Sequence, residues 1–171
     1  PANFFNINSP RGVVFDTEGN IFRVSNNDFS DLQPTYDAQF NVFSPNKTFA
    51  PTSARRMTVT FHVPGEDTPA AVSGFGAVFS DVDRNGSSSI EYYDVNGQLL
   101  ARYIVPARSD TTGLSFLGVD FGSPIVGSVI LTVGDRRVGD LLDVTDGGRF
   151  DLAIMDDFLY GEPQASSVAL R

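Results

Sequence analysis

Residues 74–106, GFGAVFSDVDRNGSSSIEYYDVNGQLLARYIVP, decide the fold of this chain. Alternating and β-prone residues predict three consecutive strands here, at GFGAVFS, SIEYYD and QLLARYIV. Asn96-Gly97 separates the last two strands. This dipeptide predicts a hairpin with a type I′ turn, because both central residues of that turn need a positive φ. The stretch therefore predicts antiparallel β structure.

The rest of the chain continues this pattern. Its cleanest alternation places Met57, Val59 and Phe61 on one face of a strand and the intervening threonines on the other, which is typical of an antiparallel sheet with one buried face. Further strands are predicted at residues 12–16, 20–25, 35–43, 114–121, 125–133 and 150–163. Many short strands between Gly, Pro, Asn and Asp breaks predict an all-β protein, an antiparallel β-sandwich of the jelly-roll type. We expect one domain at residues 1–163 and a frayed C-terminal tail at residues 164–171.

Composition and charge narrow the class of protein. The 171 residues, 41% of them hydrophobic, suffice for one domain with a real core. A net charge of −9 disfavours nucleic-acid binding, because phosphate contacts need a basic surface. No apolar run is long enough to predict a membrane span. The absence of cysteine excludes disulfide scaffolds and thiol catalysis.

The aspartates suggest a calcium site. Asp81, Asp83 and Asn85 stand at alternate positions before a glycine, a spacing that points several oxygen atoms at one cation. Asp156 and Asp157 end an apolar run, where adjacent carboxylates resist burial unless a cation or hydrogen-bond donors compensate them. We expect these five residues to bind Ca²⁺. The alternative is that the first group caps a turn and the second faces water or arginines.

Tyrosines and glutamates suggest two other sites. Tyr93 and Tyr103 flank the predicted hairpin and are candidate sugar-binding side chains, since aromatic rings stack on sugars. The alternative is that they pack in or around the core. Glycoside hydrolysis needs two acids across a cleft. Glu91 and Glu162 are the glutamates nearest to the predicted acidic cluster, and we assign them no catalytic role.

Four segments carry a family resemblance: FNINSPRGVVFDTEG, SGFGAVFSDVDRNGSSSIEYYDVNGQLL, GLSFLGVDF and DLAIMDDFLYGEP. In that order they resemble secreted bacterial β-sandwich proteins, many of which carry a PEP-CTERM sorting tail. This resemblance implies an extracellular or cell-surface location. The closing IMDDFLY is also similar to the last strand of jelly-roll carbohydrate-binding and MAM-type domains. There an acidic pair helps to hold a structural calcium, which implies that role for Asp156 and Asp157.

Together these features predict a secreted, non-catalytic module that is stabilised by Ca²⁺ and binds a polysaccharide or a surface protein. One alternative is a self-associating subunit of an extracellular assembly. Another is a small glycan-active hydrolase with paired carboxylates. A concave tyrosine-lined face would favour the binding module, and an unpaired edge strand would favour self-association.

Overall fold

The computed structural model describes residues 3–19, 21–45, 47–108, 113–140 and 148–166. Their secondary structure is almost entirely β. The two short helices are α1 (Phe4–Ile7) and α2 (Tyr36–Gln39). The strands are β1 (Val13–Thr17), β2 (Phe22–Ser25), β3 (Thr48–Pro51), β4 (Arg56–Phe61), β5 (Ala70–Ala71), β6 (Gly74–Ser80), β7 (Ser89–Tyr93), β8 (Leu99–Ile104), β9 (Leu114–Asp120), β10 (Ser128–Thr132), β11 (Ile154–Tyr160) and β12 (Gln164–Ala165).

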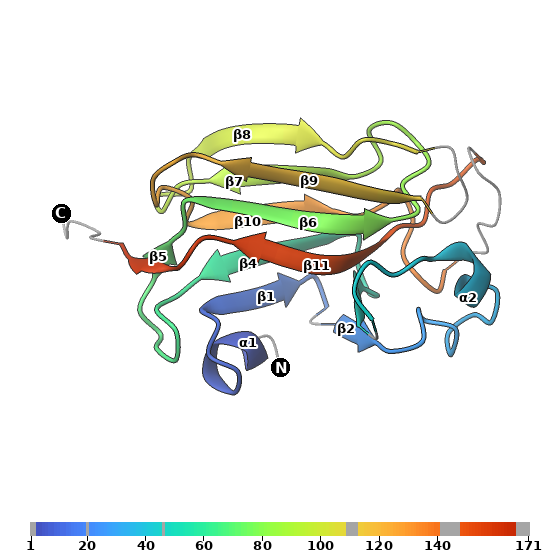
Figure 1. Cartoon of the computed structure of the whole chain (residues 1–171), viewed down its shortest axis with the longest axis horizontal. Helices are drawn as coiled ribbons and strands as arrows, with labels where there is room; N and C mark the ends of the chain where they lie inside the picture. Colours follow the sequence, from blue (N-terminus) through green and yellow to red (C-terminus); the bar gives the residue numbers. More distant parts are fainter. Residues whose placement is uncertain (1–2, 20, 46, 109–112, 141–147, 167–171) are drawn as a thin grey trace.

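Two five-stranded antiparallel sheets face each other (Figure 1). The first sheet has the order β1-β4-β10-β7-β8, and the second has the order β2-β3-β11-β6-β9. Leaving out the two-residue β5, the eight strands from β3 to β11 pair first with last: β3 with β11, β4 with β10, β6 with β9 and β7 with β8. That pairing is the rolled ribbon of a jelly roll, to which β1 and β2 each add a strand. The predicted fold is confirmed.

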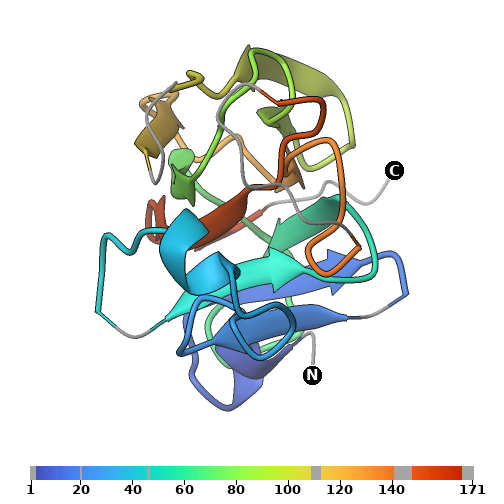
Figure 2. The same ribbon diagram turned by 90° about the vertical axis from the view of Figure 1, so that its right-hand side faces the viewer.

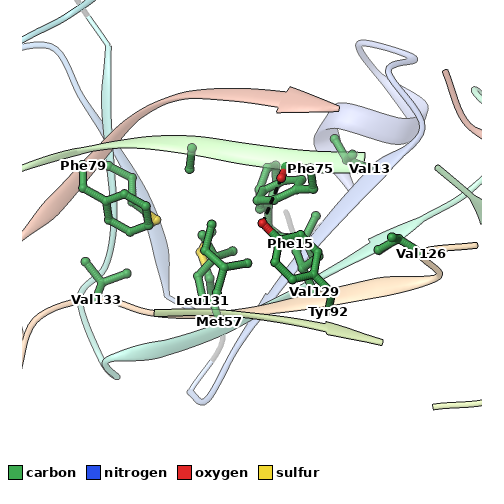
Figure 3. Packing of buried hydrophobic residues seen from close by; sticks show 14 of the residues in the cluster. Val13, Phe15, Met57, Phe75, Phe79, Tyr92, Val126, Val129, Leu131 and Val133 are labelled. Carbon is green, nitrogen blue, oxygen red and sulfur yellow. Dashed lines mark hydrogen bonds between the residues drawn. The ribbon is translucent and has the colours of Figure 1, made fainter. Parts of the chain in front are cut away.

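The hydrophobic core lies between the two sheets (Figure 3). Met57, Val59 and Phe61 are at most 1% exposed, so the alternation predicted for β4 is confirmed. Tyr92 of β7 is fully buried, and its hydroxyl donates a hydrogen bond of 3.0 Å to the carbonyl oxygen of Phe75 on β6. This bond satisfies a phenol that could not otherwise be buried, and it links the two sheets.

The strand predicted at residues 35–43 is wrong. Residues 36–39 form α2, which lies at one end of the sandwich (Figure 2). Tyr36 and Phe40 are four residues apart and therefore share a helical face. Their ring centroids are 5.1 Å apart, and both side chains pack in a second, smaller hydrophobic cluster with Leu152 and Ile154. Burial of this aromatic pair outweighs the apparent period of two.

The hairpin between β7 and β8 forms, but its turn differs from the predicted type. Gly97 has φ 80°, whereas Asn96 does not have a positive φ. The Gly97 N–H donates to the Asp94 carbonyl oxygen at 3.0 Å, and the Asp94 N–H donates to the Gln98 carbonyl oxygen at 2.9 Å. This is a three-residue loop with a left-handed glycine, which needs only one positive φ. The Asp94 carboxylate accepts hydrogen bonds from backbone N–H groups, which lower its pKa.

The C-terminal segment is paired beyond the expected boundary at residue 163. Gln164 and Ala165 form β12, opposite Ala71 and Ala70 of β5. The Ser166 N–H also donates to a backbone carbonyl of the loop before β5. The frayed tail expected at residues 164–171 therefore begins as a strand.

The long charged loop at residues 134–148 also suggests one short helical turn from its sequence, and residues 141–147 of that loop lie outside the described residues. Within the described ranges, no helix has the length and apolar character needed to cross a membrane.

Candidate functional site

A β-bulge lies at Asp156 and Asp157 in β11, where the register with β6 shifts. Oδ2 of Asp156 accepts hydrogen bonds from the backbone N–H groups of Phe43 (2.6 Å) and Ser44 (3.1 Å). Oδ2 of Asp157 accepts the Ser44 hydroxyl at 2.6 Å. Bulges re-aim side chains. Here the bulge ties the segment between α2 and β3 to β11.

Asp156 is buried with incomplete compensation. Its side chain is 0% exposed, and its Oδ1 has no hydrogen-bond partner within the described part of the chain. Burial raises the pKa of Asp156, and the charges of Asp157 and Asp28 raise it further, against the two N–H bonds that lower it. A proton or a cation at Oδ1 would relieve this unfavourable charge.

Asp81, Asp83 and Asn85 differ in their surroundings. Asp81 has φ 64° and is buried, and its Oδ2 accepts a hydrogen bond of 2.8 Å from Nε2 of Gln39. Asp83 is half-buried, and Asn85 is exposed. The three side chains of the corner between β6 and β7 therefore range from buried to exposed.

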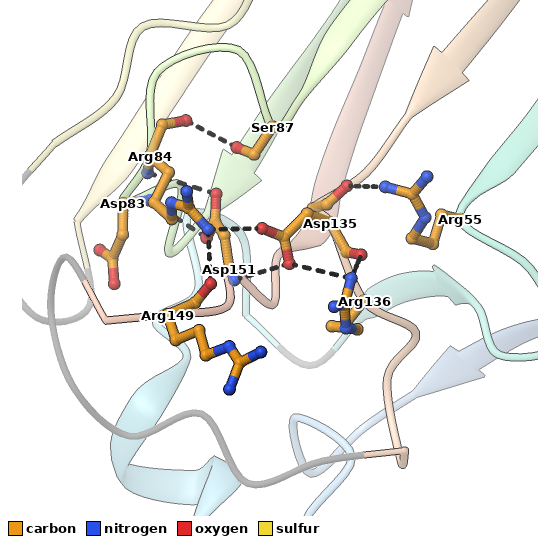
Figure 4. Close-up of polar contacts among 9 residues, drawn as sticks. Arg55, Asp83, Arg84, Ser87, Asp135, Arg136, Arg149 and Asp151 are labelled. Atoms are coloured by element: carbon orange, nitrogen blue, oxygen red, sulfur yellow. Dashed lines mark hydrogen bonds and ion pairs between the residues drawn. The ribbon is translucent and has the colours of Figure 1, made fainter.

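Asp151, which the sequence pattern did not single out, holds this corner (Figure 4). Its Oδ1 accepts the backbone N–H of Asp83 at 3.2 Å, and its Oδ2 accepts that of Arg84 at 3.3 Å. Asp151 is 1% exposed, and burial raises its pKa. Asp135 completes the cluster: it accepts the Asp151 backbone N–H at 3.0 Å and pairs with Arg84 at 2.9 Å.

The five predicted calcium ligands are thus not brought together. Among the residues that the structure describes, no group of three or more acidic, histidine or cysteine side chains could hold a metal ion. Calcium takes about six to eight oxygen ligands, and a carboxylate oxygen that already accepts N–H bonds is less available to it. Calcium binding stays a prediction. Oδ1 of Asp156, which has no hydrogen-bond partner within the described residues, makes the bulge one place where that prediction can be examined.

Tyr93 and Tyr103 lie on opposite faces of the first sheet. The hydroxyl of Tyr93 donates to Glu91 at 2.8 Å on the outer face. Tyr103 is opposite the buried Ile90, and its ring packs edge-on against Tyr92 with a centroid distance of 6.3 Å. The two tyrosines therefore do not form a shared sugar-binding platform.

The two glutamates considered for catalysis also lie apart. Glu91 is on the outer face of the first sheet, paired with Arg56 at 3.2 Å and with Arg102 at 3.5 Å. Glu162 follows β11 and lines a groove that does not include Glu91. The structure does not assemble these two acids across one cleft.

That groove has a volume of about 810 Å³ and lies between β11 and the N-terminal segment. β3 pairs with β11 only at Phe49 and Met155, so in the described structure β11 is paired beyond the bulge with β6 alone. On the open side lie α1 and β1 (Figure 1). The lining includes phenylalanine rings, called the aromatic floor below, and charged side chains, called the rim. The floor is Phe5, Phe15, Phe49 and Phe158, and the rim is Arg11, Asp157 and Glu162.

The aromatic floor of the groove is closely packed. The ring centroids of Phe15 and Phe158 are 5.2 Å apart, as are those of Phe49 and Phe158. Phe5 of α1 meets Phe15 edge-on at 5.6 Å. Rings held on several sides cannot move independently, so the floor is largely preformed.

Polar groups meet at one end of the groove. The Tyr160 hydroxyl donates to the backbone carbonyl of Arg11 at 3.1 Å. Burial raises the pKa of Tyr160, while the Arg11 charge lowers it and the Glu162 charge raises it. Sequence reasoning singled out Asp157 and Glu162 in this groove and missed Arg11, Phe5 and Tyr160. Nothing in the sequence indicates that segments about 150 residues apart would meet here.

Comparison with known proteins adds little. Neither a protein-family model nor a curated protein matches the chain. Among solved structures, the chain is similar to the enzymatically active domain of tailspike protein 4 of bacteriophage CBA120. The identity is 14% and the TM-score 0.38, over 94% of this chain and 20% of the tailspike chain. The chain thus spans about a fifth of that protein's length, and the match carries no argument about function.

Proposed function

We propose that this protein is a non-catalytic, extracellular β-sandwich module that binds a glycan in the groove between β11 and the N-terminal segment. The observation that carries the proposal is the chemistry of the groove, whose lining combines packed phenylalanine rings with the charged side chains of Arg11, Asp157 and Glu162. Ligand sites are typically concave and apolar with a few placed polar groups. A sugar ring presents the complementary surfaces, a C–H face for the aromatic floor and hydroxyls for the rim.

The test is a glycan array probed with the wild-type chain and two matched variants. Arg11→Gln combined with Leu159→Ala changes the groove, because both residues line it. Arg23→Gln combined with Leu32→Ala makes the same changes at partly exposed positions elsewhere. We expect the groove variant to lose binding about tenfold, which corresponds to about 1.4 kcal/mol, and the control to retain it. Equal binding by both variants, or no bound glycan, would contradict the proposal.

The hydrolase alternative can be separated from the binding module in the same experiment. Asp157 and Glu162 would be the two acids available to a hydrolase in the groove. We expect no release of reducing ends when the wild-type chain is incubated with each bound glycan. Release that disappears in Glu162→Gln would replace the binding module with the hydrolase.

Stabilisation by Ca²⁺ is part of the proposal, restricted to the bulge. It is supported by the buried Oδ1 of Asp156, which lacks a partner within the described residues, and by the adjacent carboxylate of Asp157. A site occupied at 100 times its Kd adds about 2.7 kcal/mol to the free energy of unfolding. We expect Ca²⁺ to raise the melting temperature of the wild type relative to EGTA. Asp156→Asn should abolish this difference in melting temperature, and Asp83→Asn should keep it. Wild-type melting curves that coincide in Ca²⁺ and EGTA would refute a calcium role.

Self-association is the second candidate, because β8 is an edge strand of the first sheet. Its exposed apolar side chains are Leu99, Tyr103 and Ile104. An exposed apolar edge can pair with the same edge of a second copy. Sedimentation velocity of the wild type and of Tyr103→Lys tests this, with Ile21→Lys as the control at another exposed apolar residue. A concentration-dependent dimer that only Tyr103→Lys removes would support it, and a monomer at all concentrations would exclude it.

A further inference from the structure

A second depression, separate from the groove, gathers arginines at one end of the sandwich. It has a volume of about 550 Å³ and lies between the turn after β1, the segment before β4 and the segment after β10. Four arginines line it, Arg55, Arg56, Arg136 and Arg137, together with three acids, Glu18, Asp135 and Asp140. The whole chain has twelve Lys and Arg residues and a net charge of −9, so a third of its basic residues line one depression.

Backbone carbonyl groups hold three of these arginines. The bonds are Arg55 Nη1 to the Gly134 oxygen (3.1 Å), Arg136 Nη1 to the Asp135 oxygen (2.8 Å) and Arg137 Nη1 to the Ser53 oxygen (3.2 Å). A neutral carbonyl fixes the orientation of a guanidinium without cancelling its charge. The guanidinium of Arg136 also lies 4.2 Å from the centre of the Phe150 ring, which restricts it further.

The positive charge of Arg55 and Arg136 is incompletely compensated. Asp135 lies 2.9 Å from Arg84, which is outside the lining, and 3.9 Å from Arg136 (Figure 4). Its charge is therefore directed mainly to Arg84. Within the described ranges, the side chain of Arg55 is bonded to the Gly134 carbonyl oxygen, and no carboxylate is paired with its guanidinium. Both arginines are exposed. Two fixed, accessible guanidinium groups thus face one depression.

We propose that this depression binds the anionic group, carboxylate or sulfate, of an acidic polysaccharide through Arg55 and Arg136. The planar donor fork of a guanidinium matches both groups in two-bond geometry. A single depression on an acidic chain accepts one anionic sugar but offers no basic track for a nucleic acid. The inference rests on the proposed glycan-binding function and names the class of glycan.

Affinity electrophoresis of the full chain tests it, in gels that contain polygalacturonate, dextran sulfate or neutral dextran. The test variant is Arg55→Gln combined with Arg136→Gln, with Arg55→Gln alone as a milder form. The control is Arg23→Gln combined with Arg102→Gln, which removes the same charge at partly exposed arginines on β2 and β8. Melting curves confirm that each variant is folded.

We expect an acidic polysaccharide to retard the wild type and the control, and the double variant to bind about tenfold or more weakly. Stronger retardation by polygalacturonate indicates a preference for carboxylate, and stronger retardation by dextran sulfate indicates a preference for sulfate. Retardation should decrease as salt is added, since exposed charges are screened over about 8 Å at physiological ionic strength. Equal weakening of the control and the double variant would overturn the inference. Retardation by neutral dextran alone would overturn the inference but leave glycan binding standing. Failure of all three gels together with an empty glycan array would overturn both.

Discussion

Replacing Asp151 tests whether the corner between β6 and β7 is held by a protein carboxylate. Asp151→Ala removes the acceptors of two backbone N–H groups, those of Asp83 and Arg84, at 3.2 and 3.3 Å. A hydrogen bond to a charged acceptor contributes about 1.5–3 kcal/mol, and these lengths favour the lower end. The expected loss is therefore about 3 kcal/mol. For a domain of this size it lowers the melting temperature by about 6–12 °C.

Asp151→Asn separates the acceptor role from the charge. Asparagine keeps one acceptor oxygen and removes the charge whose burial raises the pKa of Asp151. One of the two backbone N–H groups then loses its acceptor, so we expect Asp151→Asn to lose about half as much as Asp151→Ala, about 1.5 kcal/mol. Equilibrium urea unfolding followed by circular dichroism measures both variants, with Asp67→Ala as a fully exposed control that should not change stability. If Asp151→Asn destabilises the protein as much as Asp151→Ala, or if Ca²⁺ restores the stability of Asp151→Ala, the Asp151 carboxylate does not hold the corner as an acceptor of hydrogen bonds.

Three further predictions follow from buried groups. Burial raises the folded-state pKa of Asp156, so the wild type loses stability as the pH rises from the unfolded value of about 3.9 through that raised pKa. In melting curves without calcium, acidification from pH 7 to pH 4.5 should therefore raise the melting temperature of the wild type relative to that of Asp156→Asn. A difference between the two melting temperatures that does not change with pH would contradict this. Tyr92→Phe leaves the Phe75 carbonyl without its partner and should cost about 1–2 kcal/mol in urea unfolding, with no change in m-value. Gly76→Ala places a Cβ 2.9 Å from the Cα of Gly118 on the neighbouring strand and should cost about 1–3 kcal/mol in the same assay, so a neutral effect would show that β6 and β9 can separate freely.

The fold could be predicted from the sequence because local patterns and long-range pairing agree. Met57, Val59 and Phe61 alternate with threonines, and this period fixes which face of β4 is buried whatever its neighbours are. The strand prediction at residues 35–43 was wrong because there the local pattern and the long-range packing disagree. The apparent alternation is overridden by a distant cluster that includes Leu152, which no local window contains.

The candidate sites were less accessible to sequence reasoning. Asp156 and Asp157 stood out because adjacent acids interrupt an apolar run, and both prove to be at a bulge. Asp151 precedes such a run without a second acid and gave no comparable signal. The groove joins Phe5 and Arg11 to residues near the other end of the chain, and the arginine depression joins three loops. Such sites depend on strand order, which residue spacing does not encode.

The most direct test of the account is chemical-shift mapping of the ¹⁵N-labelled full chain, titrated with an oligosaccharide selected on the array. We expect the perturbed amides to cluster around Arg11 and the end of β11 up to Glu162. An acidic ligand should add a second cluster around Arg55 and Arg136. Perturbations confined to β8, or a spectrum that no array glycan changes, would contradict the claim that the groove is a glycan-binding site.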